Sequence, residues 1–136
     1  MKILISIFTF LMTSMSSLQA QTDAPSNAKV IIVVSTAKWC PPCKKHGARV
    51  EKEVVSQFAS NEQFAIVVND LSDANSILNS APAIKSKGLT ELLSKNKTTG
   101  VLYLVDANTK KIISKVSVKE STDDLTKAIQ SSLLKI

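Results

Sequence analysis

The sequence of 136 residues has only two cysteines and one histidine, which limits the metal chemistry it can support. A zinc ribbon needs four such ligands, so the composition argues against a zinc site built from one chain. Covalent haem attachment requires a histidine directly after the second cysteine of a pair, and Lys44 occupies that position. Our leading expectation is therefore a protein without a resident metal ion or cofactor.

The sequence also lacks an arginine-rich block, although its formal net charge is +6. The positive charge is carried by lysines that are scattered along the chain rather than clustered on one element. A nucleic-acid interface would concentrate positive charge on one element and interleave it with aromatic side chains. The pattern therefore favours a solvated surface, and we expect no nucleic-acid partner.

No apolar run in the sequence reaches the roughly 18–20 residues that a membrane-spanning helix requires. The N-terminus instead carries Lys2, an apolar run over residues 3–12 and a serine-rich stretch that ends near Ala20. This order is typical of a secretory signal peptide. We predict that residues 1–20 are a signal peptide, that the protein is periplasmic or secreted, and that no stable membrane span remains after cleavage.

Residues 28–136 are enough for one domain. Apolar runs rich in β-branched residues predict four strands, at residues 30–34, 64–68, 101–105 and 112–118. Helical patterns occupy residues 41–60, the segment 71–99 with a break around 81–82 and Gly88, and the C-terminal part from Ser121. Strands that alternate with helices pair in parallel, whereas two strands joined by a short turn form a hairpin. We predict an α/β fold in which a mixed four-stranded sheet carries helices on both faces.

Cys40 and Cys43 are separated by only two prolines. Export would place them in an oxidising compartment, where paired cysteines form disulfides. Because the loop closed by this bond is so short, the bond restricts the unfolded chain very little and adds little stability. Such a bridge is poorly suited to stabilising a fold and well suited to redox chemistry. We therefore predict a redox-active Cys40–Cys43 disulfide.

The cysteine pair stands where a strand gives way to a helix. Proline is tolerated in the first helical turn, so Cys40 should lie at the helix N-terminus and Cys43 about one turn inside it. The positive end of the helix dipole stabilises a thiolate at Cys40, which we expect to be the attacking sulfur. Cys43 shares a helical stripe with Gly47, Val50 and Val54, so we expect it to be buried and to resolve the mixed disulfide.

A second interpretation uses the same cysteines without catalysis. Soft thiolates suit Cu(I), and Cys40, Cys43 and His46 together could form a copper site. The protein would then be a binding or metal-carrier module. His46 also has a simpler interpretation, as a polar residue in the first turns of the helix.

Residues 37–44, Ala-Lys-Trp-Cys-Pro-Pro-Cys-Lys, resemble the active-site segment of the thioredoxin superfamily. The Trp-Cys-Pro-Pro-Cys form is similar to that of exported bacterial relatives and of tryparedoxins, and the element order extends the resemblance over most of residues 28–136. It implies a thioredoxin-like fold and a thiol-disulfide oxidoreductase that exchanges disulfides with protein substrates, with Cys40 as the nucleophile. A redox partner would reset the Cys40–Cys43 pair, and Trp39, Thr99 and Gly100 would border the substrate groove.

The sequence departs from the family pattern at three positions. Val34 stands where thioredoxins have a buried acid, and Ala48 stands where the helix usually has a kinking proline. Thr99-Gly100 replaces the dipeptide with the cis-proline, and we expect its peptide bond to be trans or distorted, because a cis bond without proline costs several kcal/mol. Few residues precede the first predicted strand, so we also expect no counterpart of the first strand and helix of thioredoxin. These differences keep the binding-module interpretation open.

Overall fold

The computed structural model describes residues 27–136, so the predicted signal peptide at residues 1–20 lies outside the described residues. No helix in the described part of the chain is long and apolar enough to cross a membrane. Nine labelled elements follow one another: β1 (Val30–Thr36), α1 (Pro41–Arg49), α2 (Ser56–Phe58), β2 (Phe64–Asp70), α3 (Ala74–Ser86), α4 (Thr90–Lys95), β3 (Val101–Asp106), β4 (Ile112–Ser117) and α5 (Thr122–Ser132). A π-helical segment, Val50–Val55, joins α1 to α2, and a short 3₁₀ turn, Leu133–Lys135, follows α5.

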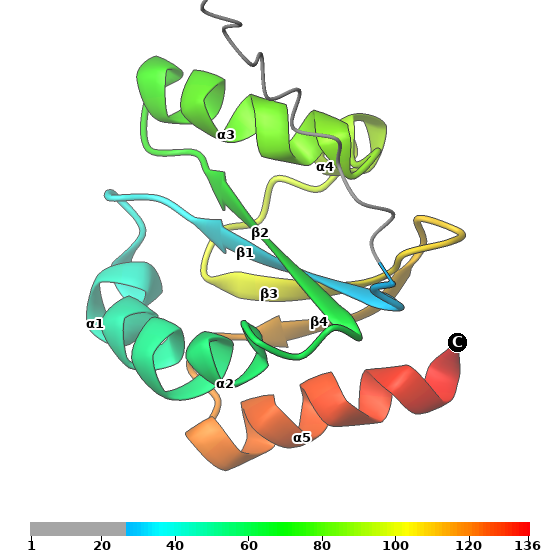
Figure 1. The fold of residues 1–136 in the computed structure, drawn as a ribbon. Coiled ribbons are helices and arrows are strands. Elements are labelled where there is room, and N and C mark those ends of the chain that lie inside the picture. Colours follow the sequence, from blue (N-terminus) through cyan, green and yellow to red (C-terminus); the bar gives the residue numbers. More distant parts are fainter. Residues whose placement is uncertain (1–26) are drawn as a thin grey trace, which may run out of the picture.

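The four strands form one mixed sheet in the order β2-β1-β3-β4. β1 pairs with β2 in parallel and with β3 in antiparallel orientation, and β3 and β4 form an antiparallel hairpin. Helices α3 and α4 cover one face of the sheet, while α1, α2 and α5 cover the other (Figure 1). The predicted α/β architecture, with a mixed four-stranded sheet and helices on both faces, is confirmed.

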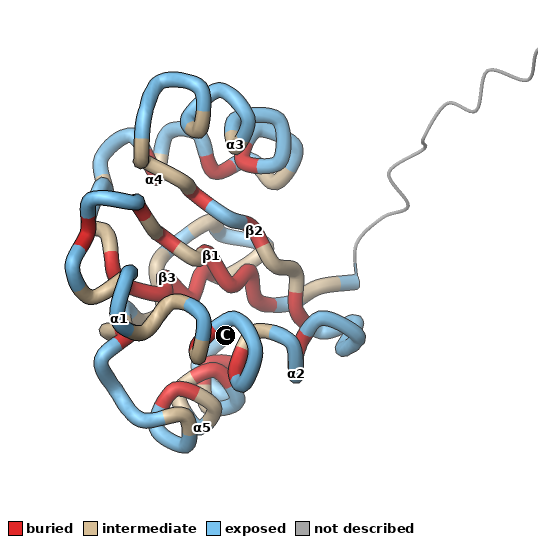
Figure 2. The backbone as a smooth tube through the Cα atoms, turned by 90° about the vertical axis from the view of Figure 1, so that its left-hand side faces the viewer, coloured by how far each residue is buried: buried red, intermediate tan, exposed pale blue. Residues whose placement is uncertain are grey.

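Alternating side chains of the central strands fill two separate cores. One core joins β1 and β3 to the π-helical segment and to α5, through Ile32, Val54, Leu102, Leu104 and Ile129. The other joins the opposite faces of the same strands to α3 and α4, through Ile31, Val33, Ile84, Leu93 and Tyr103. The buried residues therefore run along the middle strands, between two layers whose outer surfaces are exposed (Figure 2).

The helix predicted over residues 41–60 is interrupted by the π-helical turn. The N–H of Ser56 donates to the carbonyl of Glu51, which is the five-residue spacing of a π-helix. The wider turn brings Val50 and Val54 onto the core side, and Phe58 follows them in the next turn. The periodicity thus located the buried residues correctly, and it missed the change of helical pitch.

The break predicted around residues 81–82 is wrong, because α3 continues through Pro82. Proline has no N–H, so the backbone carbonyl one turn before Pro82 lacks its helical hydrogen bond. Pro82 is exposed, so water can donate to this carbonyl instead. The helix instead ends just before Gly88, which has a φ of +68°. Ser121 begins α5 as predicted, and its Oγ accepts a hydrogen bond from the N–H of Asp124 at 3.1 Å.

Candidate redox site

Cys40 and Cys43 form a disulfide at the start of α1, directly after the loop that leaves β1. Their Cα atoms are 5.3 Å apart. Cys40 is the N-cap of α1, and its Sγ accepts a hydrogen bond from the N–H of Cys43 at 3.3 Å. Pro41 and Pro42 occupy the first helical positions, where the missing N–H costs no helical hydrogen bond. The expected place of the pair at a helix N-terminus is confirmed.

The burial of Cys43 differs from the expected one. Cys40 is only 2% exposed, whereas Cys43 is partly exposed. Cys43 does lie on the stripe that faces the sheet, but Gly47 follows it there and has no side chain. A Cβ added at Gly47 would meet nothing within 4 Å apart from its own helix backbone. The expectation that Cys43 is buried under the helix is therefore wrong.

Gly100 lies directly against Cys40. A Cβ added at Gly100 would come within 3.3 Å of Cys40 Sγ and 2.9 Å of Pro42 Cγ. Its φ is +74°, and no peptide bond among residues 27–136 is cis, so the Thr99–Gly100 bond is trans as expected. The N–H of Gly100 donates to the carbonyl of Ser35 at 2.8 Å, which holds the glycine beside the disulfide. Glycine is needed here both for its backbone angle and for the close approach.

Trp39 projects from the loop before Cys40 and is 59% exposed. Its Nε1 donates to the carbonyl of Leu71 at 3.2 Å, and the N–H of Lys38 donates to Ser72 Oγ at 2.8 Å. These bonds attach the cysteine loop to the segment between β2 and α3.

The indole of Trp39 borders a pocket of about 510 Å³ between the end of β2 and helices α3 and α4. Neither Thr99 nor Gly100 lines this pocket, so the three predicted groove residues do not share one cavity. Asn69 does line it, and its side-chain Nδ2 is buried without a hydrogen-bond partner. Asn69 was not singled out from the sequence, because an asparagine near a strand end carries no signal of burial.

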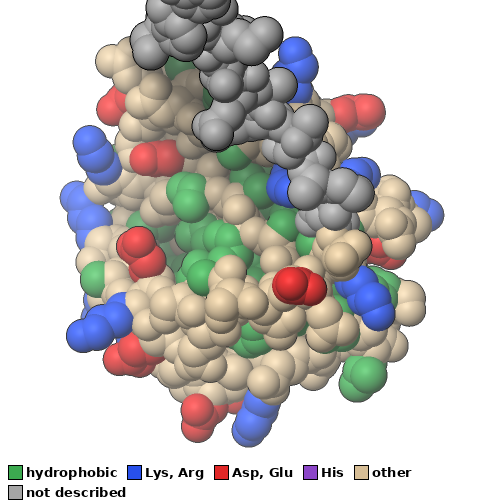
Figure 3. Space-filling view, in the orientation of Figure 1, with side chains coloured by type: hydrophobic (Ala, Val, Ile, Leu, Met, Phe, Trp, Pro, Cys, Tyr) green, Lys and Arg blue, Asp and Glu red, His purple; other side chains and the backbone are tan. Residues whose placement is uncertain are grey.

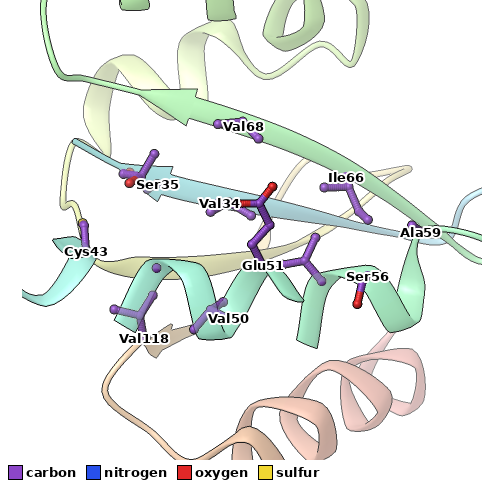
Figure 4. A pocket seen from close by; sticks show the side chains of 13 residues that line it. Val34, Ser35, Cys43, Val50, Glu51, Ser56, Ala59, Ile66, Val68 and Val118 are labelled. Carbon is purple, nitrogen blue, oxygen red and sulfur yellow. The ribbon is translucent and has the colours of Figure 1, made fainter. Parts of the chain in front are cut away.

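A second pocket, of about 540 Å³, lies between α1 and the sheet. We call it the Cys43 groove. Its 13 lining residues come mainly from α1 with the π-helical turn, from β1 and from β2: Val34, Ser35, Thr36, Cys43, Gly47, Val50, Glu51, Val55, Ser56, Ala59, Ile66, Val68 and Val118. Figure 4 shows the side chain of Cys43 rising from α1 toward the strands, with Val34, Ile66 and Val68 opposite the helix. Val34 stands where thioredoxins have a buried acidic residue, and here it forms part of the apolar wall of this groove.

Positive charge surrounds the cysteine loop, because Lys38, Lys44 and Lys45 are all exposed beside it. Asp73, the N-cap of α3, accepts a hydrogen bond from the N–H of Ser76 at 2.8 Å. This bond holds the pKa of the Asp73 carboxyl below its ordinary value, and the nearby charge of Lys38 lowers the pKa further.

The copper interpretation receives no geometric support. Within residues 27–136, no three histidine, cysteine or acidic side chains gather closely enough to hold a metal ion. Cys40 and Cys43 are joined to each other, and His46 is not brought into a ligand cluster with them.

Arg49, the single arginine of the sequence, attaches the end of α1 to the start of α5. Its Nη1 donates to Thr122 Oγ1 at 2.9 Å, and its Nη2 donates to the carbonyls of Val118 and Glu120 at 2.8 Å each. Thr122 Oγ1 in turn donates to Glu53 Oε2 at 2.8 Å. Sequence reasoning missed this network because each of its hydrogen bonds joins residues 69 or more positions apart. The only available signal was one arginine among sixteen lysines.

No protein-family model matches the chain, and no curated protein matches it by sequence. Several solved structures resemble it in fold, including the following three. A putative protein disulfide isomerase from Bacteroides thetaiotaomicron is 23% identical with a TM-score of 0.53, and the match covers 80% of this chain and 77% of that one. A thiol:disulfide interchange protein of the thioredoxin family from Chlorobium tepidum TLS is 20% identical with a TM-score of 0.51, over 79% and 81% of the two chains. Tryparedoxin II from C. fasciculata is 19% identical with a TM-score of 0.50, over 79% and 76%.

All three resembling structures carry names of thioredoxin-like or disulfide-exchanging proteins. The sheet order, the helices on both faces and the place of the cysteine pair at the start of α1 agree with this likeness. The chain therefore has a thioredoxin-like α/β fold with a Cys40–Cys43 disulfide at the N-terminus of its first helix.

Proposed function

We propose that this protein is an exported thiol-disulfide oxidoreductase that exchanges disulfides with protein substrates through Cys40 and Cys43. The observation that carries the proposal is the disulfide at the N-terminus of α1, with Cys40 Sγ accepting the N–H of Cys43. A helix N-terminus lowers the free energy of a thiolate at that position, which promotes cleavage of the disulfide. The likeness of the fold to disulfide-exchanging proteins supports the same reaction.

The site suits chemistry better than structural support. The disulfide joins residues only three positions apart, so its loss should change the free energy of unfolding very little. Exposed lysines around the loop keep the local potential positive, and Trp39 offers an exposed aromatic surface beside the disulfide for a protein substrate. A redox partner must reset the pair after each turnover, because exchange only transfers two electrons between dithiol and disulfide.

Insulin reduction by dithiothreitol tests this activity. The mature protein should accelerate the precipitation of the insulin B chain, and Cys40→Ser, Cys43→Ser and the double variant should all lose the acceleration. Circular dichroism of each variant shows whether it is folded. We expect all three variants to fold, because the disulfide stabilises the protein only weakly. Turnover by the double variant equal to that of the wild type would refute the proposal, as would the absence of turnover by the wild type in every redox buffer.

Export is tested separately by expressing the full chain in a bacterial host and fractionating the cells. We expect a product in the periplasm or medium whose N-terminus is Gln21, as cleavage after Ala20 requires. A product that keeps residues 1–20 in the cytoplasmic fraction would contradict the export part of the proposal and leave the exchange chemistry intact.

A further inference from the structure

A pocket outside the disulfide has the composition of a small-molecule site. It is the cavity of about 510 Å³ that Trp39 borders, between the end of β2 and helices α3 and α4, and we call it the Trp39 pocket. Its walls are mainly apolar and include Leu71, Ile77, Ile84 and Leu93. Small-molecule sites are concave, mostly apolar and about 300–1,000 Å³ in volume, with a few polar groups that orient the ligand.

Asn69 provides one such polar group in the Trp39 pocket, which it lines. It shares a face of β2 with Val67, a member of the core beneath α3 and α4, because side chains two positions apart in a strand point to the same side. Asn69 is only 4% exposed, and its Nδ2 is a buried donor without a hydrogen-bond partner. The terminal torsion of asparagine is broad, so the amide can turn this donor toward the pocket. A ligand with an acceptor atom would therefore satisfy a group that the protein alone leaves unpaired.

Lys97 supplies a positive charge at the same end of the sheet. Asn69 of β2 is level with Val101 of β3, because both pair with Ser35 of β1. Lys97 comes four residues before Val101 and also lines the Trp39 pocket. It is exposed and forms no salt bridge with an acidic residue within residues 27–136. The pocket thus contains an amide donor and a cationic donor near the sheet end from which the cysteine loop leaves β1.

No negative charge among the lining residues opposes these two donors, since neither aspartate nor glutamate is one of them. Asp70 follows Asn69 in the chain, but its Oδ1 accepts the N–H and the hydroxyl of Ser72. Charged side chains of both signs are spread over the face of the molecule in Figure 3, so a pocket with a lysine and no acid is a local feature. A carboxylate only accepts hydrogen bonds, and it therefore complements an amide N–H and an ammonium group. The apolar walls complement an alkyl chain.

We propose that the Trp39 pocket binds a small amphipathic carboxylate, with its alkyl chain against the apolar walls and its carboxylate accepting hydrogen bonds from Asn69 Nδ2 and Lys97 Nζ. The site is separate from the exchange reaction proposed above, because neither Cys40 nor Cys43 lines the pocket. Trp39 is where the two sites meet, since it borders the pocket and directly precedes Cys40 in the chain. Its Nε1 already donates to a backbone carbonyl, so its ring is left for apolar contact with the ligand.

Titration of the oxidised protein with octanoate, followed by tryptophan fluorescence, tests the site. Trp39 is the only tryptophan of the sequence, so its emission reports binding in the pocket that it borders. Octylammonium and 1-octanol carry the same chain with a positive charge or none. We expect octanoate to shift the emission saturably to shorter wavelengths, because its chain displaces water from the indole, and to bind about tenfold or more tightly than octylammonium. Equal affinities for the three probes, or an emission that octanoate does not change, would overturn the proposal. The insulin assay measures the exchange activity independently, so that activity would still stand.

Filling the pocket tests where octanoate binds. Ala81 and Ala83 are both exposed residues of α3, and only Ala81 lines the Trp39 pocket. Ala81→Leu should abolish octanoate binding because the larger side chain occupies the cavity, whereas Ala83→Leu, the matched control, should leave the affinity unchanged. Both variants should fold, since leucine favours helices about as well as alanine does. An unchanged octanoate affinity in Ala81→Leu would overturn the proposed location.

Replacing the two donors tests how the carboxylate is recognised. Asn69→Leu should weaken octanoate binding about tenfold and leave 1-octanol binding no weaker, because it removes only the hydrogen bond to the carboxylate. Lys97→Met should weaken octanoate binding about two- to fivefold, since an exposed ammonium contributes less. Lys85→Met is the control for net charge, because Lys85 is exposed on α3 and does not line the pocket. An octanoate affinity that neither Asn69→Leu nor Lys97→Met lowers would overturn the assignment of a carboxylate ligand.

Discussion

Replacing each of the three glycines by alanine should have three different effects on stability, and Gly100 should have the largest. Gly100 combines a φ of +74° with contacts that a Cβ would violate, at 2.9 Å to Pro42 Cγ and 3.3 Å to Cys40 Sγ. The left-handed conformation costs an L-residue about 1–2 kcal/mol. Overpacking against the active-site turn adds about 1–3 kcal/mol, since the nearest atom belongs to a rigid proline ring.

Gly88 is the matched control, because it shares the backbone conformation without the rigid neighbour. Its φ is +68°, and a Cβ there would meet only the flexible Cε of Lys110, at 3.3 Å. Gly88→Ala should therefore lose about 1–2 kcal/mol, against about 2–5 kcal/mol for Gly100→Ala. The reduced freedom of the unfolded chain offsets both losses equally and cancels in the comparison. Gly47→Ala, in a helix with open space around it, should gain about 1 kcal/mol.

Guanidinium chloride unfolding of the oxidised proteins, followed by far-UV circular dichroism, measures the three changes. Unequal midpoints with equal m-values show that stability itself has changed. The losses are large enough to detect, since a domain of this kind is stable by only about 5–15 kcal/mol. Equal losses for Gly100→Ala and Gly88→Ala would refute the close contact between Gly100 and the cysteine turn, and with it the covering of Cys40.

Three further predictions concern polar groups around the site. Arg49→Met should destabilise the protein by about 1–3 kcal/mol, because it leaves the carbonyls of Val118 and Glu120 without their donor; an unchanged unfolding midpoint would contradict the network. Asn69→Leu should raise the free energy of unfolding by about 1 kcal/mol, because it removes a buried amide nitrogen that has no hydrogen-bond partner. A lower free energy of unfolding than that of the wild type, measured by chemical denaturation, would show that this nitrogen does have a partner. The lowered pKa of Asp73 stabilises the fold above the unfolded pKa near 3.8, and this contribution disappears as the pH falls through the lower folded pKa. In Asp73→Asn, which keeps an N-cap side chain, the acid-unfolding curve should therefore be less steep below pH 3.8, and a curve identical to the wild type would exclude this carboxyl as a source of acid sensitivity.

The sequence by itself determined the four strands and the place of the disulfide. Short runs rich in β-branched residues favoured buried strands. Their alternation with helical patterns predicted parallel pairing, and the short turn before the last strand predicted a hairpin, which together give a mixed sheet. Two prolines between Cys40 and Cys43 favoured a helix start at that point, because in the first turn the missing N–H of proline costs no helical hydrogen bond. These are local properties of the chain, which is why the four strands and the N-cap position of Cys40 were predicted correctly.

Only the tertiary structure decided which of the two cysteines is the more exposed residue. The helical periodicity correctly placed Cys43 on the side of α1 that faces the sheet. Whether other side chains cover Cys43 there depends on Gly47, Val34 and β2, and Val34 and β2 are distant from Cys43 or from each other in the sequence. The covering of Cys40 likewise depends on Gly100, which lies 60 positions later in the chain. Hydrophobic periodicity predicts the face of the helix on which a side chain lies. It does not predict whether other parts of the molecule fill the space that this side chain faces. Long-range packing therefore decided the burial of the two cysteines, and it left Cys43 partly exposed at the disulfide that the sequence had correctly located.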